Sequence, residues 1–132
     1  MNTAEQRSWN MSRVPSKNTL LEVMVRRYLY SNGFRYRIKN TLPGRPDIIF
    51  PKKKIAVFVN GCFWHMHGCK LSNLPKTNIE FWLKKLTGNR IRDMETEFKL
   101  TSEGWKVIKL WQCDLKKRFY ETMFTLTSLL NQ

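Results

Sequence analysis

The chain has 132 residues and carries 24 lysines and arginines against 10 acidic residues, a formal net charge of +14. That length allows one domain with a hydrophobic core and is too short for two. No apolar run approaches the ~20 residues of a membrane span, and the N-terminal residues lack the apolar core of a signal peptide. We therefore expect a cytoplasmic protein that does not insert into a membrane, in a compartment where disulfides are rare.

The positive charge is concentrated in the first part of the chain. Residues 1–54 hold twelve basic and three acidic side chains. Such a charge attracts polyanions, and nucleic acid is the leading candidate. A membrane surface or an acidic protein would also be attracted by this positive charge, although the sequence contains no isolated basic amphipathic helix.

Residues 1–18 are predicted to form a basic arm rather than a packed element. Arg7, Arg13 and Lys17 stand among polar residues and isolated apolar ones. We expect this arm to lie along a nucleic-acid partner, and residues 19–132 to form the single folded domain.

The pattern predicts a first helix at residue 19. Thr19 and Glu22 have the spacing of a capping box, and apolar residues recur at helical spacing until Asn32-Gly33 closes the helix. Residues 34–38 then alternate apolar with basic side chains, which predicts a half-buried strand with a basic outer face. Two short strands at 47–50 and 55–59 flank a charged turn and are predicted to pair as a hairpin.

A second helix is predicted after Pro75. Thr77 and Glu80 repeat the capping-box spacing, and Thr87-Gly88 predicts a break or kink before the helix ends at Gly104.

A central strand is predicted at 105–111 and a last helix at 119–130, whose apolar residues recur at helical spacing. The element order indicates an α/β domain with a mixed sheet: the hairpin is antiparallel, and the last strand is reached through a helical crossover.

The segment 61–69 holds two of the three cysteines and both histidines. Thiolates and imidazole are ligands that zinc prefers, and four protein ligands close a tetrahedral structural site. We therefore predict a zinc site with these ligands: Cys62, His67, Cys69 and Cys113. Spacing does not separate His65 from His67, because Cys62-x-x-His65 is also a plausible pair. The alternative is a set of buried free thiols beside a surface histidine.

Two acidic residues are candidates for a second metal centre. Asp47 begins a strand one hairpin away from the cysteine-rich segment, where it could bind a hard cation such as Mg²⁺; a turn aspartate is the alternative. Glu22 already has a structural role in the capping box, so a catalytic role requires its helix end to lie beside Asp47.

Phe63 and Trp64 are consecutive, so on an extended segment they point in opposite directions. At least one ring is then exposed and available to wedge between DNA base steps. The alternative is that both rings close over a zinc-centred small core.

Taken together, these residues resemble the very-short-patch-repair (Vsr) DNA mismatch endonucleases over about residues 7–115. The matching pieces are Arg7-Ser8, Asn10-Met11, Asn18-Thr19 with Glu22, Leu42-Pro43-Gly44-Arg45-Pro46-Asp47, Gly61-Cys62-Phe63-Trp64-His65, His67 with Cys69, Glu80-Phe81-Trp82, Asn89 with Arg92-Asp93, Gly104-Trp105, and Trp111 with Cys113.

The resemblance implies a fold of the PD-(D/E)xK nuclease superfamily and a structural zinc site. It also implies Mg²⁺-dependent cutting of one strand of duplex DNA, 5′ to the thymine of a T·G mismatch left by deamination of 5-methylcytosine. A monomer suffices for one cut in one strand. Repair-protein partners fit such a role, although the residues do not identify them.

The resemblance also implies residue roles. Asp47 matches the magnesium-binding aspartate, and the residue at Val59 binds metal through its main-chain carbonyl. His65 matches a histidine proposed to activate water, while Glu22 and Asp93 match acids around the waters of the metal.

Among the remaining matches, His67 corresponds to the zinc ligand. Phe63 and Trp64 correspond to rings that wedge into DNA beside the mismatch. The N-terminal arm corresponds to an arm that wraps around the duplex.

Two departures stand out. Asn60 occupies a position where some relatives have a second histidine, and asparagine can hydrogen-bond a metal-bound water without exchanging a proton. The acid and lysine usual in the wider superfamily are also missing, as they are in the Vsr family.

The rival predictions are a nuclease of the same fold with another DNA target, and a zinc-containing DNA-binding module without catalysis.

Overall fold

The structure is a computed structural model that describes residues 19–69 and 73–132. The predicted arm, with Arg7, Arg13 and Lys17, lies outside the described residues. Within the described ranges, no helix has the length and apolar character that a bilayer crossing requires.

A three-stranded mixed sheet forms the centre of the fold. It comprises β1 (Ile48–Phe50), β2 (Ile55–Asn60) and β3 (Lys106–Trp111), in the order β1-β2-β3. β1 and β2 pair antiparallel and β2 and β3 parallel. The predicted hairpin, the parallel last strand and the mixed α/β class are therefore confirmed.

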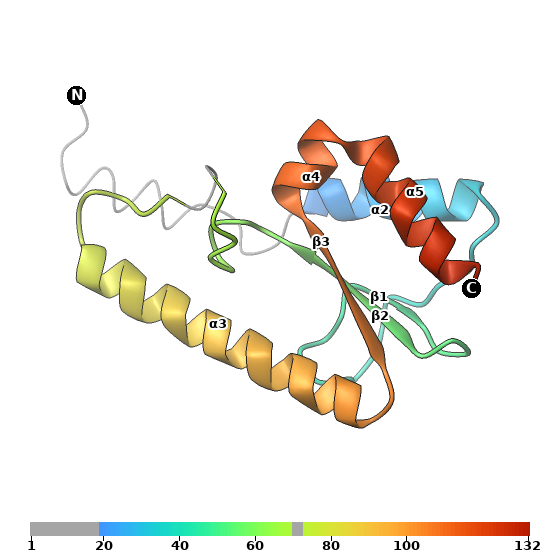
Figure 1. Cartoon of the computed structure of the whole chain (residues 1–132), viewed down its shortest axis with the longest axis horizontal. Helices are drawn as coiled ribbons and strands as arrows, with labels where there is room; N and C mark the ends of the chain where they lie inside the picture. The colour runs from blue at the N-terminus through green and yellow to red at the C-terminus, as the bar shows by residue number, and fades with distance from the viewer. Residues whose placement is uncertain (1–18, 70–72) are drawn as a thin grey trace.

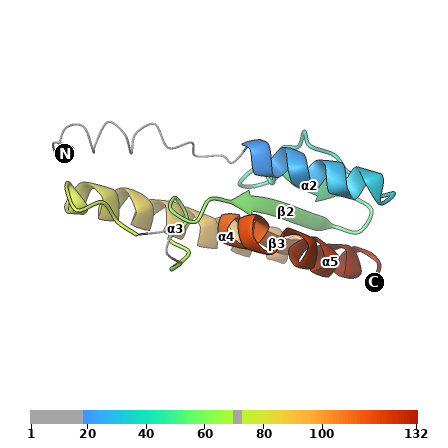
Figure 2. The same cartoon turned by 90° about the horizontal axis from the view of Figure 1, so that it is seen from above.

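Helices cover both faces of this sheet (Figures 1 and 2). α2 (Thr19–Ser31) and α5 (Phe119–Leu130) pack on one face, and α3 (Ile79–Ser102) packs on the other. Because side chains alternate along a strand, β2 sends one set of residues to each layer. Ile55, Val57 and Val59 join the core under α2 and α5, whereas Ala56 and Phe58 pack on the side of α3.

Residues 34–38 do not form the predicted strand. Arg37 makes a single antiparallel bridge with Ile49, and the segment is otherwise irregular. The Asn40 side chain explains where the pairing ends, because its amide donates to the carbonyls of Ile38 and Pro46, both at 3.0 Å, and folds the chain back on itself. A local side-chain bond of this kind competes with a sheet ladder.

The predicted break at Thr87-Gly88 is also wrong, because α3 runs unbroken for 24 residues. Trp82, Leu86 and Leu100 are buried along it, and each such burial contributes about 1.5–3 kcal/mol. One glycine inside a helix costs only about 1 kcal/mol. Tertiary packing therefore outweighs the local signal.

The helix starts and the chain end differ in detail from the prediction. α3 begins at Ile79 after Asn78, whose backbone is left-handed (φ 56°) and whose side chain makes no capping bond, so the Thr77/Glu80 capping box is wrong. α2 begins at Thr19 as expected. The structure does not describe the Thr19 side chain, so the capping box of Thr19 and Glu22 stays a prediction. The short helix α4 (Gln112–Lys117) was not predicted.

Candidate functional site

A cavity of about 290 Å³ opens where β1 begins, β2 ends and α3 crosses them. Six of the residues singled out in the sequence line it: Asp47, Val59, Asn60, Trp64, His65 and Asp93. Glu22 lies in the first turn of α2 and is not among the lining residues. The structure thus brings the other residues expected around Mg²⁺ together with the water-activating histidine at one cavity.

Asp47 is held against β2 by two hydrogen bonds. Its carboxylate Oδ2 accepts from the Val59 amide at 2.7 Å, and its own amide donates to the Val57 carbonyl at 3.0 Å. The hairpin register therefore fixes the carboxylate beside the end of β2. Oxygen atoms of the Asp47 and Asp93 carboxylates and of main-chain carbonyls are the donors that a hard divalent cation prefers, so the lining fits Mg²⁺.

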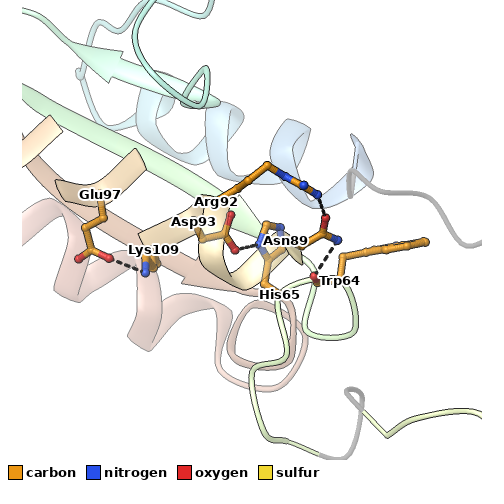
Figure 3. Close-up of polar contacts among 7 residues, drawn as sticks. All are labelled: Trp64, His65, Asn89, Arg92, Asp93, Glu97 and Lys109. Carbon is orange, nitrogen blue, oxygen red and sulfur yellow. Dashed lines mark hydrogen bonds and ion pairs between the residues drawn. The ribbon is translucent and has the colours of Figure 1, made fainter. Parts of the chain in front are cut away.

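His65 and Asp93 are joined by a short hydrogen bond at the cavity wall (Figure 3). The Nδ1 atom of His65 lies 2.5 Å from Oδ2 of Asp93, and the two side chains are 22% and 32% exposed. When Asp93 is ionised, it favours the tautomer with the proton on Nδ1 and leaves Nε2 as a hydrogen-bond acceptor. His65 is therefore oriented as a proton acceptor.

α3 also holds the loop through a second chain of contacts (Figure 3). Asn89 Nδ2 donates to the Trp64 carbonyl at 3.3 Å, and Arg92 donates to Asn89 Oδ1. Arg92 and Asn89 line the cavity too, together with Thr96.

These cavity residues had no role assigned from the sequence. Arg45, Asn89 and Arg92 belonged to the resemblance without a function. Thr96 was missed, although it too lines the cavity. The cavity residues on α3 could have been found from their spacing in the sequence. Positions 89, 92, 93 and 96 fall on one face of a helix, which here is the face above β2.

The three cysteines and His67 gather on the far side of the same loop. One ligand atom from each of Cys62, His67, Cys69 and Cys113 lies within 4.8 Å of every other. His67 Nδ1 is 3.5 Å from the Cys62 sulfur and 3.4 Å from the Cys113 sulfur. Three thiols and one imidazole at this separation fit a closed tetrahedral zinc site, and the cluster is consistent with the predicted one.

Cys62 is the most buried member of this cluster. Burial raises the pKa of the Cys62 thiol to about 12, so without a metal it is a neutral thiol at physiological pH. The Cys113 amide donates to the Cys62 sulfur at 3.4 Å, a bond that favours a thiolate once a metal displaces the proton.

A left-handed turn separates the two histidines. Residues two apart on an extended chain point to the same side, but Met66 between them has φ 50°. His67 consequently turns back to stack on Trp111, with ring centroids 4.0 Å apart and planes 9° from parallel. The structure therefore places His67 with the cysteines and His65 at the cavity, a choice that spacing had left open.

Phe63 and Trp64 are both buried, at 6% and 8% exposure, so the expectation of an exposed ring is wrong for this structure. The structure agrees better with the alternative, in which both rings pack in a small core, but that core is not centred on the Cys/His cluster. Both rings pack against Trp82 and Leu86 of α3.

Comparison with known proteins gives the family. The profile described as "DNA mismatch endonuclease Vsr" matches residues 1–71. The chain is 47% identical to the type II nicking enzyme V.XorIIP of Xanthomonas oryzae pv. oryzae, over 84% of this chain and 82% of that protein. It is 36% identical to the DNA mismatch endonuclease Vsr of Escherichia coli, over 96% of this chain and 81% of that protein.

The chain belongs to the Vsr family. This Vsr-family protein is therefore a DNA endonuclease, a hydrolase, and the resemblance found in its motifs is confirmed. Another relative, the type II nicking enzyme V.NmeAIP of Neisseria meningitidis, is 44% identical over 88% of this chain and 84% of that protein.

Proposed function

We propose that this Vsr-family endonuclease cuts one strand of duplex DNA 5′ to the thymine of a T·G mismatch, in a reaction that requires Mg²⁺. The observation that carries the proposal is that the His65–Asp93 pair and Asp47 line the same cavity. A proton acceptor and a cation-binding carboxylate on one cavity are what metal-assisted phosphodiester hydrolysis needs.

The Asp47 carboxylate and the main-chain carbonyl of Val59 would hold Mg²⁺, with Asp93 and Asn60 near its waters. Glu22 is not part of the cavity lining and would act on those waters from the first turn of α2. Bound there, Mg²⁺ would supply positive charge for the phosphate and orient it for attack. The hydrogen bond from Val59 to Asp47 Oδ2 supports this assignment, because it fixes one carboxylate oxygen beside that carbonyl.

His65 would take the proton from the attacking water at Nε2. Its Nδ1 is engaged with Asp93, and the aspartate stabilises the imidazolium that forms as the proton arrives. Asn60 is buried at the cavity wall and can hydrogen-bond a water or the phosphate, but it cannot exchange the proton. His65 therefore carries the proton transfer alone in this proposal.

Phe63 and Trp64 would recognise the mismatch by leaving their cluster and wedging between base steps. A T·G pair stacks poorly on its neighbours, so opening that step costs less than in matched DNA. The cluster of Phe63, Trp64, Trp82 and Leu86 contains one destabilising feature. Among the described residues, Trp82 Nε1 has no hydrogen-bond partner. An unsatisfied buried donor costs about 1–3 kcal/mol, which offsets part of the cost of opening.

A second candidate is a nicking enzyme that reads a DNA sequence without requiring a mismatch. It is favoured by the higher identity to proteins named type II nicking enzymes, 47% and 44%, than to the protein named mismatch endonuclease, 36%. In this case the cavity and its chemistry are unchanged, and only the DNA recognition differs.

The test is single-turnover nicking of two duplexes that differ only at the mismatched position, T·G against C·G, with and without Mg²⁺. Rapid cutting of the T·G duplex alone supports the first proposal. Equal cutting of both would leave the sequence-reading alternative, and no cutting with Mg²⁺ would leave a DNA-binding module without catalysis.

We further propose that residues 1–18 form an arm along the DNA, with Arg7, Arg13 and Lys17 near phosphates. Residues 19–132 would form one nuclease domain that acts as a cytoplasmic monomer, with zinc in a structural role. Protection of residues 1–18 from protease by duplex DNA is the expected result. Equal cleavage with and without DNA would rule the arm out.

A further inference from the structure

A second cavity lies at the opposite end of the sheet from the candidate active site. Its volume is about 420 Å³, and it forms where the turn at residues 51–54, the segment after α2 and the last residue of α5 meet. Figure 1 shows this turn and the loop after β2 at opposite ends of the sheet.

The cavity combines an aromatic floor with a basic rim. Its floor is made by Phe34, Tyr36 and Phe50, which also pack on the main core. Its rim carries four exposed cations: Arg35, Arg37, Lys52 and Lys53.

No carboxylate in the described part of the chain neutralises the rim cations. In residues 19–69 and 73–132, none of the four pairs with a carboxylate; Arg35 lies over the Tyr30 ring at 4.0 Å. Residues 23–54 contain nine lysines and arginines and one acidic residue, Asp47, which lies in the other cavity. The second cavity therefore has a strongly positive potential.

The position of this cavity argues against its being part of the DNA path. Phe50 belongs to the core on the face of α2 and α5, whereas the active cavity opens between Phe58 and Asp93 on the face of α3. β2, with six residues, separates the two ends by about 17 Å at ~3.3 Å per residue. To contact both cavities, a straight duplex would have to span this distance and also pass from one face of the sheet to the other.

We propose that this basic cavity is a docking site for an acidic segment of a partner protein. An apolar side chain of that segment would lie on the aromatic floor, and neighbouring carboxylates would pair with the rim. Apolar anchors in a pocket and arginines that bind acidic motifs are the usual sources of affinity in such sites. The site is separate from the proposed nicking reaction and does not depend on it.

The test uses a short fluorescein-labelled peptide of alternating glutamate and leucine, with a peptide of glutamate alone for comparison. Binding to the full-length protein is followed by fluorescence anisotropy without added divalent metal. The variant carries Lys52→Glu and Lys53→Glu, two exposed turn positions. The matched control carries Lys116→Glu and Lys117→Glu, also consecutive and exposed, so both proteins lose the same charge.

We expect the glutamate–leucine peptide to bind at least ten-fold more weakly to the Lys52/Lys53 variant than to the wild type and the control. We also expect it to bind more tightly than glutamate alone, and saturating T·G duplex not to displace it. Equal weakening in both variants would mean general charge attraction and would overturn the proposal. Displacement by the duplex, together with slower nicking by the Lys52/Lys53 variant, would identify the cavity as a DNA contact instead.

Discussion

The imidazole of His65 and the carboxylate of Asp93 lie 28 positions apart in the sequence and meet at 2.5 Å. One belongs to the loop after β2 and the other to the middle of α3, so the contact joins this loop to the helix that covers the cavity. This relationship gives His65 a defined orientation, and it is directly testable.

Asp93→Asn should slow nicking by about 10²-fold. The amide can keep a hydrogen bond to Nδ1 but loses the charge that stabilises the imidazolium and the preference for the reactive tautomer. Single-turnover rates on saturating T·G duplex provide the measurement. Glu97→Gln, one turn further along α3, is the control, because Glu97 pairs with Lys109 at 2.8 Å instead of with His65. Wild-type rates for Asp93→Asn would show that the pair has no catalytic role.

Asp47→Asn should abolish nicking while leaving duplex binding and the melting temperature near those of the wild type. The amide oxygen can still accept from the Val59 amide, a bond of 2.7 Å in the structure, but it lacks the charge that holds Mg²⁺.

Asp47→Ala should lose activity and stability together, because it leaves the Val59 donor unsatisfied at a cost of about 1–3 kcal/mol. Activity, duplex affinity and thermal melting are measured on both variants. Retained nicking by Asp47→Asn would remove Asp47 from the metal site.

A T·G duplex should change tryptophan fluorescence more than a matched duplex at saturation. Trp64 and Trp82 are buried at 8% and 2% exposure in the free protein, and opening of their cluster would alter their surroundings. Trp64→Phe should remove most of this difference. Trp105→Phe should retain it, because Trp105 lies beyond the C-terminal end of α3 and packs in a different cluster. Identical emission changes with both duplexes would contradict the wedge.

Gly88→Ala should stabilise the protein by about 1 kcal/mol in urea unfolding, since alanine is the better helix former. An added Cβ would meet Arg92 at 3.7 Å, an ordinary contact. Gly33→Ala is the opposing control: it also has open space, but its φ of +87° strains any L side chain, and it should destabilise. A loss of stability in Gly88→Ala would mean that α3 depends on flexibility at this point.

Local patterns were sufficient for the hairpin, the parallel strand and the last helix, since their burial follows their own periodicity. They failed where distant packing decides. Gly88 signals a break, but Trp82 and Leu86 pack against the loop after β2 and Leu100 packs against the sheet, so α3 stays continuous across Gly88. The segment around Arg37 alternates like a strand, yet the Asn40 side chain ends its pairing after one bridge.

The residue types of the site could be predicted from the sequence, but the separate roles of its two histidines were harder to predict. Cysteine and histidine spacing indicated a metal, whereas the assignment of the two histidines depended on a turn at Met66 that no spacing rule reveals. The cavity wall on α3 was underestimated because Asn89, Arg92 and Thr96 become a site only when the helix lies over β2.

The most direct test of the account is to compare His65→Ala and His67→Ala for zinc content, melting temperature and nicking of a T·G duplex. The account predicts that His65→Ala retains one zinc per chain and the wild-type melting temperature but nicks orders of magnitude more slowly. His67→Ala should lose zinc and melt at a lower temperature. Loss of zinc in His65→Ala with full retention in His67→Ala would contradict the division of this loop between a structural metal and the active site.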